Sequence, residues 1–340
     1  MSEYSSNPWN VGESDFPATG TSAEQVKFLL NYAVLAPSRH NVQPWLFKVD
    51  WNTVELHADR SRSLPAADPD DREMIISCGA ALANFLIAAR YFGYVANVDM
   101  HHDPAKRDLL ARVSLEKGGV ATQEEQKLFH AIKQRRTNRQ LFKDQAVPAS
   151  LLSALGGIAA REATVFQVVW GVEARYALAS LIATGDQLLW ENKRFREEIA
   201  GWTRPVINQS LDGVPAYAHG TGDMASYLGP LRIRTFMDNA EAEKEQHLAS
   251  GSPVFAVLLT HADTWFDWLA AGQALEKILL HARCEGVWAS FFSQPIEVAR
   301  LQKDLQAILG RAEVPQLVLR MGYAAEVPPT PRRSVSDVLL

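Results

Sequence analysis

Apolar and polar positions along the first third of the chain alternate with the periods of helices and strands. The pattern predicts a helix over 23–35 that ends at Pro37, and then a hairpin of strands over 46–49 and 54–57. A buried helix over 73–91 and strands near 95–100 and 111–115 follow. This mixed order of helices and strands favours an α+β fold over a doubly wound parallel sheet.

The buried helix has a second copy later in the chain. Gly79-Ala80-Ala81-Leu82 matches Gly272-Gln273-Ala274-Leu275 at an offset of 193 positions, and His57-Ala58-Asp59 is echoed by His261-Ala262-Asp263. Glycine at 79 and 272 would let two such helices approach closely. We therefore predict two tandem units, over 22–120 and 121–340, packed as a pseudo-twofold fused dimer behind a loose N-terminal arm over 1–21.

Composition then narrows the function classes. The chain has 340 residues, 47% of them hydrophobic, and a net charge of −5, so a large core is expected and neither nucleic acid nor a membrane is an expected partner. Cys78 and Cys284 lack metal-ligand spacing and are expected to be buried thiols in a reducing compartment, which predicts a cytoplasmic protein. His101-His102-Asp103 is interpreted as a polar turn, and no metal is expected.

The richest polar stretch is 36–45, between the first helix and the first strand. Pro37 and Pro44 stiffen it, so its side chains could contact a ligand or could equally cap a structural turn. Aligning Trp45 with Trp170 shows that the second unit has lost this stretch, because Ala163 and Phe166 stand opposite Ser38 and Asn41. The second unit instead opens on Arg135-Arg136-Thr137-Asn138-Arg139. Its arginines could bind a phosphate group, or the segment could be the solvated, basic start of a helix.

Together these motifs resemble the nitroreductase-like flavoproteins, which commonly show Arg-Arg-Ser-x-Arg and Pro-Ser-x-x-Asn-x-Gln-Pro-Trp. The resemblance is greatest to the tandem, single-chain, Acg-type branch, and it extends from about Ala23 to Val338. Segments 286–297, 315–323 and 331–333 support it. The resemblance implies FMN as cofactor and NAD(P)H as a transient electron donor, with the motifs of the two units forming one composite site.

The resemblance also implies roles for single residues. The phosphate and ribityl end of FMN would be held by Arg135, Thr137, Arg139 and Arg332. The first unit would contribute Ser38, Arg39 and Asn41. Backbone amides at Glu297 and Val298, after the turn at Gln294, would face the flavin N5 and O4 atoms. The substrate pocket would include His40, Tyr217 and Tyr227.

The damaged repeat predicts one FMN per chain, so that a monomer is sufficient for one flavin site. Phe166, Val168 and Trp170 would fill the other interface. An insertion over about 202–250 has no counterpart in the first unit, and we interpret Trp202 to Tyr227 as a lid over the flavin. The alternative is a surface excursion that only covers core.

Three functions follow from the resemblance. The leading one is an FMN oxidoreductase that takes hydride from NAD(P)H and reduces a small-molecule electron acceptor, a nitro compound or a quinone, in a ping-pong cycle. The second is a flavin-sequestering protein with little or no reductase activity. The third, a fold that has lost flavin, conflicts with the intact motifs.

Overall fold

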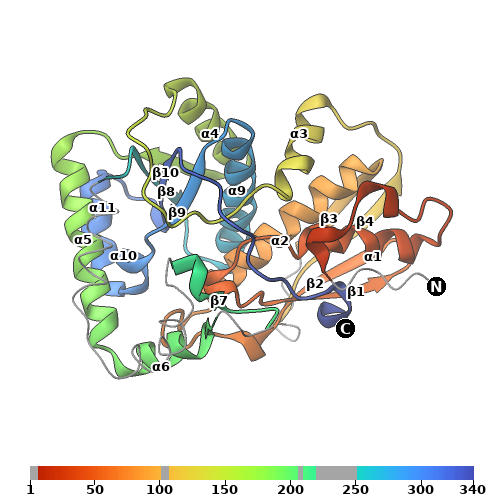
Figure 1. Ribbon diagram of the computed structural model, residues 1–340, viewed down its shortest axis with the longest axis horizontal. Coiled ribbons are helices and arrows are strands. Elements are labelled where there is room, and N and C mark those ends of the chain that lie inside the picture. Colours follow the sequence, from red (N-terminus) through yellow and green to blue (C-terminus); the bar gives the residue numbers. More distant parts are fainter. Residues whose placement is uncertain (1–6, 101–106, 206–209, 220–250) are drawn as a thin grey trace.

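The computed structural model describes residues 7–100, 107–205, 210–219 and 251–340, and within them two four-stranded antiparallel sheets stand at opposite sides of a pair of central helices (Figure 1). One sheet has the order β1-β2-β4-β3 and the other β5-β8-β10-β9. The first comprises β1 Trp45–Asp50, β2 Thr53–Ala58, β3 Tyr94–Asp99 and β4 Leu109–Lys117. The second comprises β5 Thr164–Val168, β8 Val254–Thr260, β9 Trp288–Phe291 and β10 Val314–Gly322. Because each strand has a counterpart at the same place in the other sheet, the predicted α+β fold with two tandem units is confirmed.

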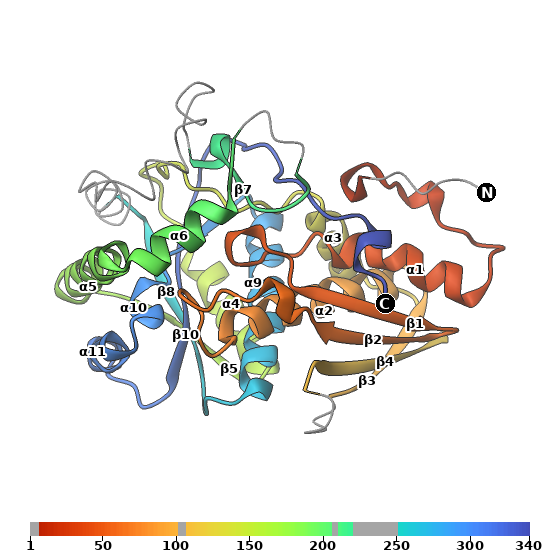
Figure 2. The same cartoon turned by 90° about the horizontal axis from the view of Figure 1, so that it is seen from below.

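The helices divide between the two units in the same way. The first unit carries α1 Ser22–Ala33 and α2 Arg72–Tyr91, and the second carries α4 Ala149–Arg161 and α9 Trp265–Cys284. A linking helix, α3 Gln123–Ile132, lies between them in sequence. The second unit alone adds α5 Val172–Glu191 and α6 Lys193–Trp202 after β5, and α10 Gln294–Glu297 and α11 Gln302–Leu309 after β9. These additions gather at the far side of the second sheet (Figure 2).

Helices α2 and α9 pack against each other through the two glycines that the repeat singled out. A Cβ atom on Gly79 would lie 2.2 Å from the carbonyl oxygen of Leu269, and one on Gly272 would lie 2.0 Å from that of Ile76. Leu269 follows Ile76 by the same 193 positions that separate the glycines, so the two contacts are equivalent. The predicted pseudo-twofold packing of the units is therefore present.

Among the described residues, helix α3 and the C-terminal tail extend from the second unit into the core of the first. Helix α3 buries Leu128, Phe129 and Ile132 in the apolar core of the first sheet. The C-terminal tail places Val338 in that core, and the amide of Leu340 donates to the carbonyl of Phe47 at 2.9 Å beside β1 (Figure 1). The unit boundaries proposed from the sequence stay predictions.

Several expectations need correction. Cys78 is buried, but Cys284 is exposed, because it lies in the last turn of α9. The side chain of Trp170 is 66% exposed, so it fills no interface, whereas Phe166 is buried in the second core. The described part of the N-terminal arm is not loose, since the indole of Trp9 donates to the carbonyl of Thr330 at 2.9 Å.

Helix α2 is long and apolar enough to cross a membrane by length and composition, but its most apolar window is 83% buried inside the fold, as the sequence predicted for a core helix. Tyr227, the segment His101-His102-Asp103 and most of the insertion over 202–250 lie outside the described residues.

Candidate functional site

The predicted arginine motif and the predicted polar loop meet at a cavity of about 90 Å³ between the two units, which we call the basic cavity. The arginine motif follows α3, the polar loop follows α1, and the C-terminal tail closes the third side. Seven residues expected from the sequence line this cavity: Ser38, Asn41, Arg135, Thr137, Arg139, Tyr217 and Arg332. Residues that are far apart in sequence thus form one composite site.

Positive charge in the basic cavity exceeds the negative charge that faces it. The guanidinium of Arg135 lies 3.3 Å from the buried carboxylate of Glu276 and donates to the carbonyl of Leu35 at 2.9 Å. Burial, and then the proximity of Arg135 and Arg136, lower the pKa of Arg332. Burial followed by repulsion from Arg135 also lowers the pKa of Arg136, to about 10.

Arg332 itself is 4% exposed, and its Nε has no hydrogen-bond partner among the described residues. A buried donor without a partner is costly, and repelling guanidinium groups are stabilised by a shared anion. The donor set therefore fits a phosphate group.

The loop that carries the arginines is held by residues that the sequence did not single out. Asn138 is fully buried; its amide NH donates to the carbonyl of Ala289 at 3.0 Å, and its side chain donates to that of Ala325 at 2.8 Å. Arg320 on β10 donates to the carbonyl of Gln140 at 3.0 Å. Asn138 could have been identified from the sequence, because it is an amide side chain inside the arginine motif. No local pattern marks Arg320.

A second cavity of about 220 Å³, the wide cavity, adjoins the basic cavity and shares Pro37, Ser38, Thr137, Arg139 and Val214 with it. Its lining includes the expected residues Ser38, Arg39, His40, Thr137, Arg139 and Gln294. The opposite wall is largely apolar and comes from α5 and α6, through Leu189, Trp190, Phe195 and Ile199. Sequence reasoning missed this wall, because an apolar helix face that lines a cavity has the same pattern as one that packs in a core.

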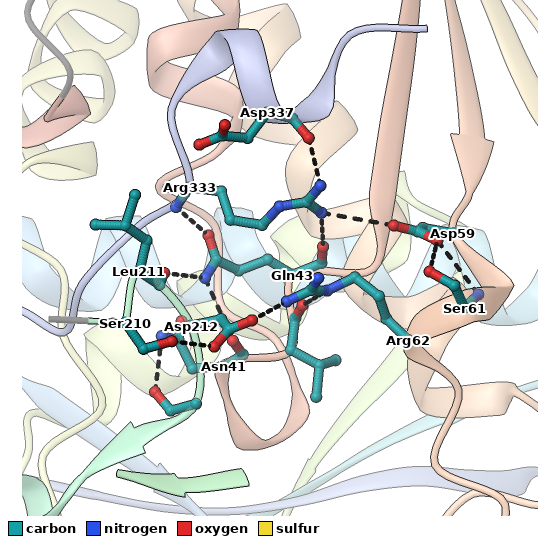
Figure 3. Close-up of polar contacts among 12 residues, drawn as sticks. Asn41, Gln43, Asp59, Ser61, Arg62, Ser210, Leu211, Asp212, Arg333 and Asp337 are labelled. Carbon is teal, nitrogen blue, oxygen red and sulfur yellow. Dashed lines mark hydrogen bonds and ion pairs between the residues drawn. The ribbon is translucent and has the colours of Figure 1, made fainter. Parts of the chain in front are cut away.

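Asn41 and Gln43 hold the polar loop to two other segments (Figure 3). The side chain of Asn41 donates to the carbonyls of Gly213 and Pro331, both at 3.0 Å, and accepts a hydrogen bond from Arg332 at 2.8 Å. Gln43 donates to the carbonyl of Leu211 at 2.8 Å and accepts from the amide of Arg333 at 2.8 Å. Asn41 therefore positions Arg332, a role that the sequence did not predict.

Residues 210–215, which we call the covering segment, lie over the junction of the two cavities. Val214 on β7 (Val214–Pro215) lines both of them. Asp212 pairs with Arg62 and with Arg204, the latter at 2.8 Å from β6 (Thr203–Arg204). The described part of the predicted lid is thus tied to the polar loop, and its gating role stays a proposal.

Arg39 points to a cluster of carboxylates beside the wide cavity. Its guanidinium contacts both oxygens of Glu297, at 2.5 and 2.7 Å, and its Nε lies 3.3 Å from Glu73. The amides of Glu297 and Val298 donate to the carbonyls of Ser293 and Gln294. These hydrogen bonds close the single turn of α10, and the carboxylate of Glu297 anchors Arg39. That the two amides face a flavin ring stays a prediction.

Two carboxyl groups of this cluster, those of Glu297 and Asp68, have raised pKa values and so tend to stay protonated. Burial raises the pKa of Glu297 to about 8, with Arg39 opposing the rise and Glu73 and Asp68 adding to it. Burial and then Glu73 raise the pKa of Asp68 to about 7. Burial lowers the pKa of Arg39, but Glu297 and Glu73 more than offset this. Arg39 thus stays charged, and the surplus of carboxyl groups around it retains a proton.

This cluster predicts that the fold loses stability as the pH rises from about 5 to 8. Between the ordinary carboxyl pKa and the raised values, the folded state binds more protons than the unfolded state, so the free energy of unfolding falls with pH. Glu297→Gln removes one titrating group and should flatten this slope. Urea unfolding at several pH values measures it, with Glu116→Gln, at an exposed position of β4, as the control. An unchanged slope in Glu297→Gln would contradict the assignment.

No family model matches the chain. "Putative NAD(P)H nitroreductase Rv3131" of Mycobacterium tuberculosis is 31% identical over 323 residues, which cover 93% of this chain and 91% of the relative. The uncharacterised protein Rv3127 of the same organism is 30% identical, with 92% of each chain covered.

The nitroreductase-named protein Acg of M. tuberculosis is 26% identical and covers 95% of this chain and 97% of its own length. Solved structures resemble the chain more weakly. One of them is the FMN-dependent nitroreductase NfnB from Mycobacterium smegmatis, which is 19% identical with a TM-score of 0.42. The match covers 62% of this chain and 96% of NfnB. The resemblance found in the sequence is confirmed by the relatives that match along nearly their whole length. The chain belongs to the NAD(P)H nitroreductase-like family that includes Rv3131 and Acg.

Proposed function

We propose that the protein binds FMN between its two units and is an NAD(P)H-dependent oxidoreductase. The observation that carries this proposal is that the two cavities adjoin: a mostly apolar cavity that would take a ring system shares lining residues with a small cavity lined by arginines. FMN has this same division between an aromatic ring and a phosphate. Two relatives are named as putative NAD(P)H nitroreductases, which supports NAD(P)H as the electron donor.

Within this proposal the phosphate is bound by Arg332, Arg136 and Arg139, with Thr137 as a hydroxyl donor. The ring lies in the wide cavity, where apolar residues of α5 and α6 exclude water from one face. Bound flavin would accept hydride from the nicotinamide and pass two electrons to an acceptor. The residues of the chain orient both partners, and a nitro compound or a quinone is the proposed acceptor in a ping-pong cycle.

One FMN per chain is the proposed stoichiometry. Glu276, which lies beside Arg135, is matched in the repeat by Ala83, because the two positions differ by 193. An alanine cannot hold an arginine in the pseudo-equivalent place, so the first unit lacks this element of a second phosphate site. A single chain in the cytoplasm would therefore hold one active flavin.

A second candidate function is flavin sequestration, and the covering segment favours it. Asp212 is paired with Arg204 and with Arg62, and Figure 3 shows the second of these pairs. Asn41 and Gln43 donate hydrogen bonds to the carbonyls on either side of Asp212. A segment fixed by this many contacts over the junction of the cavities would slow the entry of nicotinamide to the ring.

Stopped-flow bleaching of the bound flavin separates these functions. For an oxidoreductase, NADH or NADPH should bleach the flavin of the wild-type protein rapidly, and a nitroaromatic or a quinone should restore the colour. For a sequestering protein, dithionite but neither nicotinamide should bleach it, and Asp212→Asn should make it accessible, because the variant loses the charge that pairs with Arg62 and Arg204. Asp70→Asn, at an exposed position, is the matched control. A purified protein that neither contains nor takes up FMN would contradict both functions.

A further inference from the structure

The indole of Trp9, in the N-terminal arm, lies against two arginines of the basic cavity. The guanidinium carbon of Arg136 is 4.0 Å from the centre of the indole ring, and that of Arg332 is 5.4 Å from it. Both distances are within the range of about 6 Å at which the face of an aromatic ring attracts a cation. The two arginines line the cavity and Trp9 does not, so the indole contacts them from behind.

A hydrogen bond extends this contact to the C-terminal tail. The indole NH of Trp9 donates to the carbonyl of Thr330 at 2.9 Å. The hydroxyl of Thr330 in turn accepts a hydrogen bond from Arg332 at 2.5 Å. One side chain of the arm therefore contacts the guanidinium of Arg332 and also holds the loop that positions it.

The arm has other anchors, which do not depend on Trp9. Val11 is 2% exposed in the core of the first sheet, and Phe16 stacks on Phe92 with 4.5 Å between the ring centres. Lys133, two positions before the arginine motif, donates to the carbonyl of Val11. Trp9 is only partly buried beside this core. Loss of the indole should therefore leave the arm in place.

The arginines need such support because they face one small cavity with the same charge. Arg136 and Arg332 are close enough to repel each other, and repelling side chains turn apart unless other contacts hold them. A ring that attracts both guanidinium groups holds them in place before an anion arrives. Groups that are already in position bind a ligand more tightly, because binding does not have to order them.

We propose that Trp9 is a positioning residue for the flavin phosphate, which holds Arg136 and Arg332 together at the basic cavity and makes the N-terminal arm part of the cofactor site. This inference rests on the proposed function and extends its site to a segment that precedes the first unit. Trp9 acts through the two arginines and does not itself touch the phosphate.

The matched variants are Trp9→Phe, Trp9→Leu and Trp170→Leu. Phenylalanine keeps an aromatic face but loses the indole NH, whereas leucine keeps only an apolar side chain. Trp170 is 66% exposed after β5 and lines neither cavity, so it controls for the loss of a tryptophan elsewhere. Flavin-free protein is titrated with FMN and with riboflavin, which lacks the phosphate, and flavin fluorescence measures each affinity.

Trp9→Leu should weaken FMN binding by about tenfold, as expected for a partly desolvated cation–π contact, and should leave riboflavin binding unchanged. Trp9→Phe should bind FMN within about threefold of the wild type, and Trp170→Leu should match the wild type with both flavins.

Equal FMN affinities in wild type and Trp9→Leu would overturn the inference and leave the proposed function intact. An equal loss for FMN and riboflavin would also overturn it, because the indole would then support the fold and not the phosphate site. Failure of the wild-type protein to bind FMN would overturn the proposed function itself.

A double-mutant cycle shows whether Trp9 acts through Arg136, the nearer of its two arginines. Arg136→Gln removes the charge beside the indole, so adding Trp9→Leu to it should weaken FMN binding by less than about threefold further. A further loss as large as that in the wild-type background would show that Trp9 acts independently of Arg136, and would overturn the inference.

Hydrogen exchange provides a readout on the wild-type protein alone. The amide of Asn10 donates to the carbonyl of Asn7 at 3.0 Å, beside Trp9, so its exchange reports opening of the arm. If the arm strengthens phosphate binding, bound phosphate must stabilise the arm by the same factor. FMN should therefore slow exchange at Asn10 by about tenfold, and riboflavin should not. Equal exchange with the two flavins would overturn the inference whatever the variants show.

Discussion

Gly272→Ala is expected to lower the free energy of unfolding by about 3 kcal/mol, at the upper end of the usual cost of overpacking. The new Cβ atom would lie 2.0 Å from the carbonyl oxygen of Ile76 and 2.8 Å from the Cα of Gly79. Both obstructing atoms belong to backbone, so a change of side-chain rotamer cannot relieve the clash. Helices α2 and α9 would have to move apart, which would also open the cavities between the units.

Urea unfolding followed by circular dichroism measures this effect, and Gly156→Ala is the matched control. Gly156 is also in a helix, α4, but a Cβ atom there would meet nothing within 4 Å. That substitution should raise the free energy of unfolding by about 0.5 to 1 kcal/mol, because alanine favours the helix. Equal stabilities for the two variants would show that the close contact of the helices does not hold the units together.

Arg332→Gln is expected to weaken FMN binding by about 10-fold to 100-fold, the range for a lost hydrogen bond to a charged group. Arg332 is the buried guanidinium whose pKa is lowered by burial and by its arginine neighbours. An FMN phosphate would offset that cost in the wild-type protein, and a glutamine would bind it less strongly. Fluorescence titration of flavin-free protein with FMN measures the change.

Two controls separate phosphate binding from a structural role. Riboflavin has no phosphate, so its affinity should be the same in Arg332→Gln and in the wild type. Arg333→Gln removes the next arginine, which contacts the carbonyl of Gln43 and is not part of the lining of the basic cavity, and it should leave FMN affinity within about threefold. An equal loss for riboflavin and FMN in Arg332→Gln would mean that the variant distorts the loop around Asn41 instead.

The sequence predicted the parts of the fold that depend on local pattern and on the repeat. Helical spacing identified α1, and Gly79 and Gly272 identified the crossing of α2 and α9. The polar loop and the arginine motif could be paired because each is intact in only one unit. These signals are contained in short windows or in a constant offset, so they need no knowledge of the path of the chain.

Other parts of the site depend on contacts that no local pattern encodes. Arg39 and Glu297 are 258 positions apart, and neither sequence neighbourhood indicates its partner. The short helix α10, whose single turn includes the amides of Glu297 and Val298, was not foreseen either. Trp190 and Phe195 resemble core residues in sequence, and only the path of α5 and α6 turns them toward a cavity.

The crossing tail has a consequence for the order of events during synthesis. Arg332, which completes the basic cavity, and Val338, which completes the core of the first sheet, are translated after both sheets. Domains usually fold from the N-terminus while the chain is still growing, yet the core of the first sheet here includes Val338, which emerges after the second unit. On the proposed function, the basic cavity is therefore incomplete until Arg332, near the end of the sequence, has been translated.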